Sequence, residues 1–169
     1  FGYQMRFNLR EGFPAVTTKK LAWKAVVGEL LWFLEGSSDE RRLAELTYGK
    51  TRSELKDKTT IWTANADNQA KKLGYQNDEF VKELGPIYGV QWRNFGDNSN
   101  LLNSDKFGFD QIKWLIKEIK TNPDSRRIIL NAWNPPKISS MTLPPCHVMS
   151  IFRVYNGKLN CVLTQRSAD

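Results

Sequence analysis

The chain has 169 residues, 40% of them hydrophobic and 25% charged, a composition that supports a folded core and excludes intrinsic disorder. Two cysteines and one histidine argue against a disulfide framework and a zinc site, and no apolar run is long enough to cross a membrane. A net charge of +7 fits anionic partners, although the charge alone favours a lysine-rich solvated surface as its explanation. We expect one metal-free cytoplasmic domain over residues 1–169, incomplete at both ends because the chain lacks an initiator Met and stops directly after a strand-like run.

The first half of the chain alternates between apolar and polar segments. Residues 5–9 alternate apolar and polar side chains, which predicts a first strand. Apolar periodicity predicts a helix over residues 19–35 that Gly36 ends. The capping-box spacing of Ser37 and Glu40 predicts a short polar helix over residues 39–46. Residues 47–60 are polar and rich in lysine, so we expect them on the surface.

The second half carries the clearer signals. Apolar residues at helical spacing between 112 and 119 predict an amphipathic helix, and the apolar run 128–133 predicts a buried strand. The dipeptide Asn156-Gly157 is the strongest short hairpin signal, and it predicts two paired strands over residues 150–164.

A two-residue turn at this dipeptide fixes which residues of the hairpin lie opposite each other. It pairs Phe152 with Cys161, His147 with Arg166 and Cys146 with Ser167, unless a bulge shifts the register. It also leaves Cys146 roughly 20 Å along the strand from the level of Cys161, which excludes a disulfide between them.

Cys146 is a candidate nucleophile. Two prolines precede it, and the hairpin brings Arg166 beside it, where a cation favours the reactive thiolate. The alternative is a buried structural cysteine, a description that suits Cys161 better. His147 is a candidate general base by adjacency alone, but neighbouring strand residues point to opposite faces.

Glu29 falls on the apolar side of the first predicted helix. A carboxyl group there is desolvated, so we expect a raised pKa that suits proton transfer near neutrality. A structural glutamate with a backbone or arginine partner is an equally good interpretation.

Arginines gather at the ends of predicted elements. Arg126 and Arg127 precede a strand, and Arg166 with Ser167 follows another, so together they form a candidate site for a phosphate dianion. Surface ion pairs are the ordinary alternative. The chain has no P-loop and no dinucleotide fingerprint, so neither a nucleoside triphosphate nor a nicotinamide is expected.

Six segments together resemble the thymidylate synthase family, in family order across essentially the whole chain. They are FPAVTTK at 13–19, ELLWFL at 29–34, LGPIYG at 84–89, PDSRRI at 123–128, LPPCH at 143–147 and QRSAD at 165–169. The resemblance implies an α/β (α+β) fold with a large mixed β-sheet, flanking helices, and a sheet back that forms a homodimer interface.

The same resemblance implies reductive methylation of dUMP to dTMP, with 5,10-methylenetetrahydrofolate as co-substrate and no nicotinamide. The Cys146 thiolate would add to C6 of the pyrimidine, and Arg126 and Arg127 would reach the phosphate of the partner subunit. The family's site residues correspond to Cys146, Glu29, Arg166 and Tyr88 for catalysis, to Arg126, Arg127, Arg166, Ser167, Ala168 and Asp169 for dUMP, and to Asp169, Trp62, Lys19 and Leu143 for folate.

Two alternatives remain open at this point. A phage-type dCMP or dUMP hydroxymethylase shares the scaffold, and the family's base-reading asparagine would follow Asp169. A basic nucleic-acid-binding module without enzymatic activity is the second, although the arginines concentrated near Cys146 count against it. The family's phosphate loop would precede Phe1, Ala22 stands where many relatives have a histidine, and residues 37–60 resemble some bacteriophage versions in length.

Overall fold

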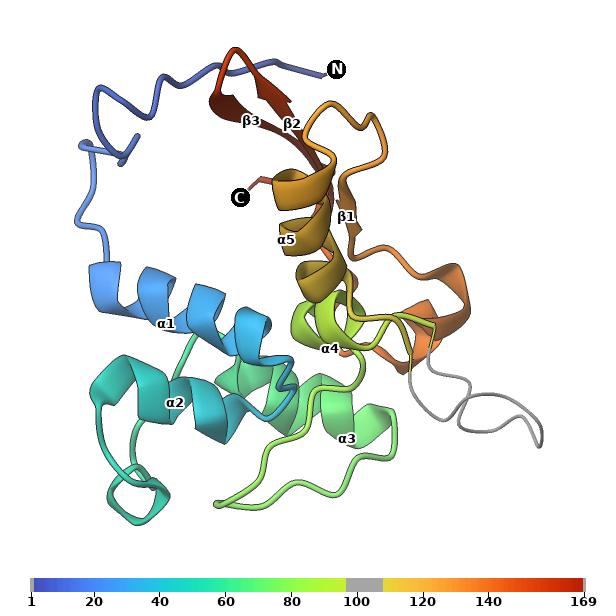
Figure 1. Ribbon diagram of the computed structural model, residues 1–169. Helices are drawn as coiled ribbons and strands as arrows, with labels where there is room; N and C mark the ends of the chain where they lie inside the picture. The colour runs from blue at the N-terminus through green and yellow to red at the C-terminus, as the bar shows by residue number, and fades with distance from the viewer. Residues whose placement is uncertain (1, 97–107, 169) are drawn as a thin grey trace, which may run out of the picture.

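The computed structural model describes residues 2–96 and 108–168. Helices α1 to α4 lie together, and α5 lies next to α4 and against the sheet (Figure 1). The elements in chain order are α1 (Trp23–Glu35), α2 (Glu40–Tyr48), η1 (Arg52–Glu54), η2 (Asn65–Gln69), α3 (Ala70–Lys72), α4 (Tyr88–Arg93), α5 (Gln111–Thr121), β1 (Ile129–Asn131), η3 (Pro135–Ser140), β2 (His147–Tyr155) and β3 (Lys158–Gln165).

The first two helices follow their sequence signals closely. Gly36 ends α1 in the left-handed conformation, at a φ of 78°, which glycine adopts without steric cost. The helix starts at Trp23, later than predicted, and the segment before it is largely exposed. Asp39 rather than Ser37 caps α2, because its side chain accepts the backbone N–H of Arg41 at 3.1 Å.

The main core lies where α1, α2 and α4 meet the 60–66 turn and the segment after β1. It is rich in aromatic side chains, which supply much apolar area per residue. Its buried hydrophobic members are Trp32, Phe33, Leu43, Trp62, Ala66, Leu84, Ile87, Tyr88, Ala132 and Met141. A second cluster, built on Leu115, Ile128 and Leu130, packs α5 against the sheet.

The sheet of the described residues has three antiparallel strands in the order β1-β2-β3. The α/β class is therefore confirmed, although the sheet is smaller than the large mixed sheet that we expected. The helix predicted over 112–119 and the strand predicted over 128–133 are present as α5 and β1. Every residue of β3 is exposed.

The strand predicted over residues 5–9 is wrong. The segment has no strand pairing and turns at Leu9 and Arg10, and Met5, Phe7 and Leu9 are 66%, 58% and 71% exposed. Alternation makes a strand only where a neighbouring strand satisfies the backbone, and no described strand pairs with this segment. Figure 1 shows it as an arc that runs from α1 toward the β2–β3 hairpin.

Residues 47–60 lie mainly on the surface, as predicted, with one exception. Leu55 is completely buried, and it follows the single 3-10 turn η1. This segment is therefore anchored to the helical part of the molecule rather than extended away from it.

Candidate active site

Cys146 lies immediately before β2, next to the end of β3. The backbone N–H of Arg166 donates to the Cys146 carbonyl at 3.0 Å. The hairpin has the predicted pairing at Phe152 and Cys161, but an irregularity between His147 and Met149 shifts the register by one residue. His147 is therefore opposite Gln165, and its predicted pairing with Arg166 is wrong because the sequence rule assumes an unbroken ladder.

The Arg166 side chain folds back over the loop that carries Cys146. Its Nε donates to the carbonyl of Pro145 at 2.9 Å and its terminal nitrogen to that of Pro144 at 2.8 Å. The guanidinium also lies 5.6 Å from the centre of the Trp133 ring. A fixed positive charge is thus held beside the backbone that leads into Cys146, in agreement with the prediction that these two residues are neighbours.

Tyr88 reaches the same point from the start of α4. Its hydroxyl oxygen accepts the backbone N–H of Cys146 at 2.5 Å and that of His147, more weakly, at 3.4 Å. The residue is only 4% exposed, and this burial raises the pKa of the Tyr88 phenol, against the opposing effect of the backbone hydrogen bonds from Cys146 and His147. A single phenol therefore holds the backbone on both sides of Cys146.

Glu29 approaches from the middle of α1. The indole N–H of Trp62 donates to its carboxylate at 2.6 Å. Burial raises the pKa of Glu29, while the Trp62 hydrogen bond and the nearby His147 oppose that increase. The raised pKa was predicted from the position of Glu29 on the helix, but its tryptophan partner was not, because the two residues are 33 positions apart.

Ring contacts join these groups into one cluster. The Tyr88 ring stacks on Phe33 at 4.6 Å between centroids, and it lies 6.2 Å from Trp62 and 5.8 Å from His147. A candidate nucleophile and a carboxyl group with a raised pKa therefore face the same aromatic wall. This arrangement suits covalent addition coupled to proton transfer.

Comparison with known proteins shows the family to which this site belongs. The thymidylate synthase family model matches residues 1–169. The chain belongs to the thymidylate synthase family. It is 47% identical over 169 residues to the thymidylate synthase of Enterobacteria phage T4, covering 100% of this chain and 52% of that protein. It is 46% identical over 171 residues to the bifunctional dihydrofolate reductase-thymidylate synthase of Daucus carota, covering 100% of this chain and 30% of that protein.

The fold agrees with this assignment. The crystal structure of the T4 phage thymidylate synthase matches with a TM-score of 0.80 and 47% identity, over 95% of this chain and 50% of that one. The chain thus spans about half the length of the phage relative and a third or less of the bifunctional one.

Other residues that the thymidylate synthase resemblance assigned lie at the same end of the hairpin. Ser167 is half-buried, its carbonyl accepts the side-chain amide of Gln165 at 2.6 Å, and Ala168 is exposed. Leu143, in the loop before Cys146, is 37% exposed. Asp169 lies outside the described residues.

Three assigned residues lie apart from this cluster within one chain. The β1–β2 register pairs Ile129 with Ile151. The exposed Arg126 and Arg127, which precede Ile129, therefore lie level with the end of β2 that is far from Cys146. At the rise per residue of a strand, this separation is roughly 20 Å or more. Lys19 is exposed and precedes α1. The part of α1 from its first residue to Glu29 is about six residues, or roughly 9 Å along the helix axis, so Lys19 lies beyond that distance from Glu29 along the axis.

Neither cysteine forms a disulfide, as predicted, and Cys161 is exposed rather than buried. Its side of the hairpin has no covering element among the described residues. Partial burial still raises the pKa of the Cys161 thiol, against a hydrogen bond to Ser150. In residues 2–96 and 108–168, no cluster of histidine, cysteine and acidic side chains fits a metal ion, and no helix is long and apolar enough to span a membrane.

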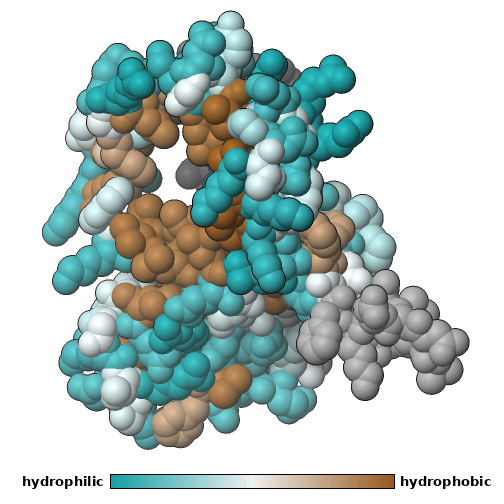
Figure 2. Space-filling model, in the orientation of Figure 1, coloured by the Kyte–Doolittle hydropathy of each residue, from teal (hydrophilic) through white to brown (hydrophobic). Residues whose placement is uncertain are grey.

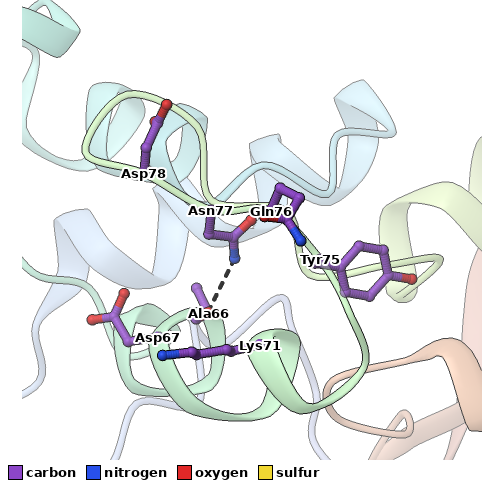
Figure 3. Close-up of a pocket in the computed structure, with 7 residues that line it drawn as sticks. All are labelled: Ala66, Asp67, Lys71, Tyr75, Gln76, Asn77 and Asp78. Atoms are coloured by element: carbon purple, nitrogen blue, oxygen red, sulfur yellow. Dashed lines mark hydrogen bonds between the residues drawn. The ribbon is translucent and has the colours of Figure 1, made fainter.

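A cavity of about 410 Å³ lies away from this cluster, between η2, α3 and the loop that follows them (Figure 3). None of the assigned site residues lines it. Its lining consists of Ala66, Asp67, Lys71, Tyr75, Gln76, Asn77 and Asp78. A smaller cavity of about 130 Å³ borders His147 beside the sheet.

Proposed function

We propose that this protein catalyses the reductive methylation of dUMP to dTMP, and that residues 1–169 are part of one thymidylate synthase-like domain. The observation that carries the proposal is the convergence of Cys146 and Glu29 on the Tyr88–Trp62 aromatic wall, in a chain of this family. We assign the enzyme to the cytoplasm, where unpaired cysteines stay reduced.

In this proposal the Cys146 thiolate forms a bond to C6 of the pyrimidine. The electron pair of the C5–C6 double bond shifts toward C5 and the C4 carbonyl, so an otherwise inert carbon becomes nucleophilic. Once C5 has bonded to the one-carbon unit, removal of the C5 proton would release the folate amine. Hydride arriving at the transferred carbon would then restore the C5–C6 double bond and expel the thiolate. Tyr88 and Arg166 support the step by fixing the backbone around Cys146, which keeps the sulfur aimed at C6.

Glu29 is the proposed proton-handling group. A carboxyl group with a raised pKa is present in both protonation states nearer neutral pH, where it can donate a proton to the pyrimidine or accept one through water. Trp62 holds one of its oxygens. The other oxygen remains for the substrate or an ordered water.

The phosphate of dUMP would be held by arginines from two subunits. Arg166 and Ser167, with Ala168, lie at the Cys146 end of the hairpin, and Asp169 follows them in sequence. Arg126 and Arg127 lie too far from Cys146 to serve its own phosphate site, which supports their assignment to the partner subunit of a homodimer.

When bound, methylenetetrahydrofolate would supply the one-carbon unit and the hydride. The exposed residues fit such a ligand, because Leu143 offers apolar surface for a flat ring and Lys19 lies at the surface, where it can meet an anionic tail. Trp62 is only 5% exposed and keeps its N–H on Glu29, so its contact with the ring would be limited to the small uncovered part of the indole.

Product analysis tests this proposal. We expect the protein, incubated with methylenetetrahydrofolate and either dUMP or dCMP, to convert dUMP to a product heavier by a methyl group, and Cys146→Ala to make none. A hydroxymethyl product, or a preference for dCMP, would instead establish the hydroxymethylase alternative. The family assignment gives no support to a non-enzymatic nucleic-acid-binding module.

A further inference from the structure

An ion pair is buried at the start of α2. Glu40 is completely buried and Arg41 is 2% exposed, and two nitrogens of the guanidinium donate to the two carboxylate oxygens at 2.7 and 2.8 Å. Removing two charges from water is costly, and the mutual attraction offsets the cost only where the remaining hydrogen bonds are also satisfied. The other hydrogen bonds of Glu40 and Arg41 show which part of the chain the ion pair holds in place.

Arg41 fastens the segment that leads to Trp62. Its guanidinium donates to the carbonyl of Leu55 at 3.0 Å and to that of Lys58 at 3.1 Å. These bonds span 14 and 17 residues of chain, so they close the 47–60 segment against α2. Lys58, the second of these anchor points, lies two residues before the turn that begins at Thr60.

Glu40 fastens the turn itself. Its Oε1 accepts the hydroxyls of Thr60 at 2.7 Å and Thr63 at 2.6 Å. The Thr60 hydroxyl oxygen in turn accepts the backbone N–H of Trp62 at 3.1 Å, and the Thr63 hydroxyl oxygen accepts the backbone N–H of Thr60 at 2.8 Å. Thr60 and Thr63, which lie before and after Trp62 in this turn, are therefore both bonded to one buried carboxylate.

We infer that Glu40 and Arg41 are positioning residues for the reaction. Through Thr60 and Thr63 they set the turn that presents the Trp62 indole N–H to Glu29, although neither residue contacts the site. The expected effect on the rate of turnover rests on the proposed function. The chain of hydrogen bonds from Glu40 through Thr60 and Thr63 to the Trp62 turn does not depend on it.

The experiment uses the full-length protein and compares Thr60→Val with Thr60→Ser. Valine removes the hydroxyl at nearly constant volume, whereas serine keeps it. Thr63→Val and Glu40→Gln extend the series to the other hydroxyl and to the carboxylate. Glu35→Gln is the matched control, since Glu35 of α1 also pairs with an arginine of α2, Arg42, but at an exposed position.

Two readouts are recorded for each variant. The first is the kcat and KM for dUMP, and the second is the NMR signal of the Trp62 indole N–H, which is assigned among six tryptophans with Trp62→Phe. We expect Thr60→Val to lower kcat about tenfold, with KM changed by less than about twofold, because the reacting groups are displaced by a fraction of an ångström. The indole proton should move upfield as its hydrogen bond to Glu29 weakens.

Rescue and control complete the test. Thr60→Ser should restore both readouts, and Glu35→Gln should change neither. The inference is wrong if the indole signal and kcat do not change together in Thr60→Val, or if Glu35→Gln has the same effect. If the unmodified protein makes no dTMP, the proposed function fails, and the indole signal still decides whether Glu40 positions Trp62.

Discussion

Tyr88 is the residue on which the local geometry of Cys146 depends. Its buried hydroxyl accepts the backbone N–H of Cys146 from an element 58 residues away, so the sulfur is positioned by a side chain of α4 as well as by its own strand. Glu29 shows the complementary case, in which a helix carries an ionisable group to the same place and one indole N–H orients it.

The first prediction concerns the Tyr88 hydroxyl. Tyr88→Phe leaves the Cys146 N–H without its acceptor in a buried setting, so we expect a loss of about 1–3 kcal/mol in the free energy of unfolding, together with slower turnover. Urea unfolding measures the loss. Tyr48→Phe is the control, because the Tyr48 hydroxyl bonds a carbonyl at a position that is 41% exposed; equal losses in the two variants would contradict the assignment.

The second prediction concerns the ionisation of Glu29. Its folded-state pKa is raised above the ordinary value of 4.5, so between the two values the folded state binds more protons than the unfolded state. The contribution to stability is then complete below pH 4.5 and is lost as the pH rises through the folded-state pKa. Glu29→Gln, which keeps the oxygen facing Trp62, should remove this loss.

Unfolding free energies of both proteins over that pH range test the prediction. The difference between Glu29→Gln and the unmodified protein should grow in favour of the variant as the pH rises. A constant difference would mean that the carboxyl group titrates normally in the folded state.

At the scale of elements, two segments far apart in sequence meet below the site. The turn that leads into α4 passes directly against the end of η3, which in turn leads to the Cys146 loop. Gly85 marks the contact, with a φ of 79° and no room for a side chain. A Cβ there would lie 2.2 Å from the Ser140 carbonyl oxygen.

The third prediction compares two glycines. Gly85→Ala should be strongly destabilising, by about 3 kcal/mol or more, because overpacking against backbone adds to the strain of a positive φ. Gly157→Ala carries the same backbone strain in open space, so we expect about 1 kcal/mol there. Thermal unfolding of both variants decides; similar losses would show that the close approach at Gly85 does not matter.

The whole molecule leaves broad apolar surfaces uncovered. Figure 2 shows hydrophobic side chains gathered along α1 and on the side of the molecule that faces the N-terminal segment. Trp23, Leu30 and Leu31 of α1 are about half exposed, at 49%, 52% and 47%. Surfaces of this kind are typical of protein contacts, which agrees with a site assembled from more than one part.

The fourth prediction is that the phosphate site is shared between subunits. Arg126→Ala combined with Arg127→Ala should raise the KM for dUMP about tenfold or more, since two charge-assisted contacts are lost. Mixing this variant with inactive Cys146→Ala under subunit exchange should restore part of the activity, because one site of each hybrid then has all its groups. Steady-state kinetics of the mixture measures this, and absence of any recovery would contradict a shared site.

Local signals in the sequence predicted the elements that depend on local interactions. The periodicity of α5 and the Asn156-Gly157 turn gave the correct helix and hairpin, and the position of Glu29 on its helix gave the correct direction of its pKa. The irregularity beside His147 and the exposed segment 5–9 were not predictable, because each depends on whether a neighbouring strand is present and regular.

The buried ion pair shows a different limit of sequence reasoning. Glu40 and Arg41 lie in a segment that the sequence predicts only as a short polar helix, yet they are among the most buried side chains. Their burial depends on carbonyls and hydroxyls 14 to 23 residues away. No pattern within the segment itself carries that information, and the same is true of the contact between Trp62 and Glu29.

The most direct test of the central claim is the intact mass of the protein after incubation with 5-fluoro-dUMP and methylenetetrahydrofolate. Fluorine at C5 replaces the proton that must leave before the thiolate is released, so the covalent adduct is trapped. We predict that the unmodified protein gains the mass of both ligands and that Cys146→Ala gains neither. A folded, unmodified protein without an adduct, or an adduct retained in Cys146→Ala, would contradict the assignment of Cys146 as the nucleophile.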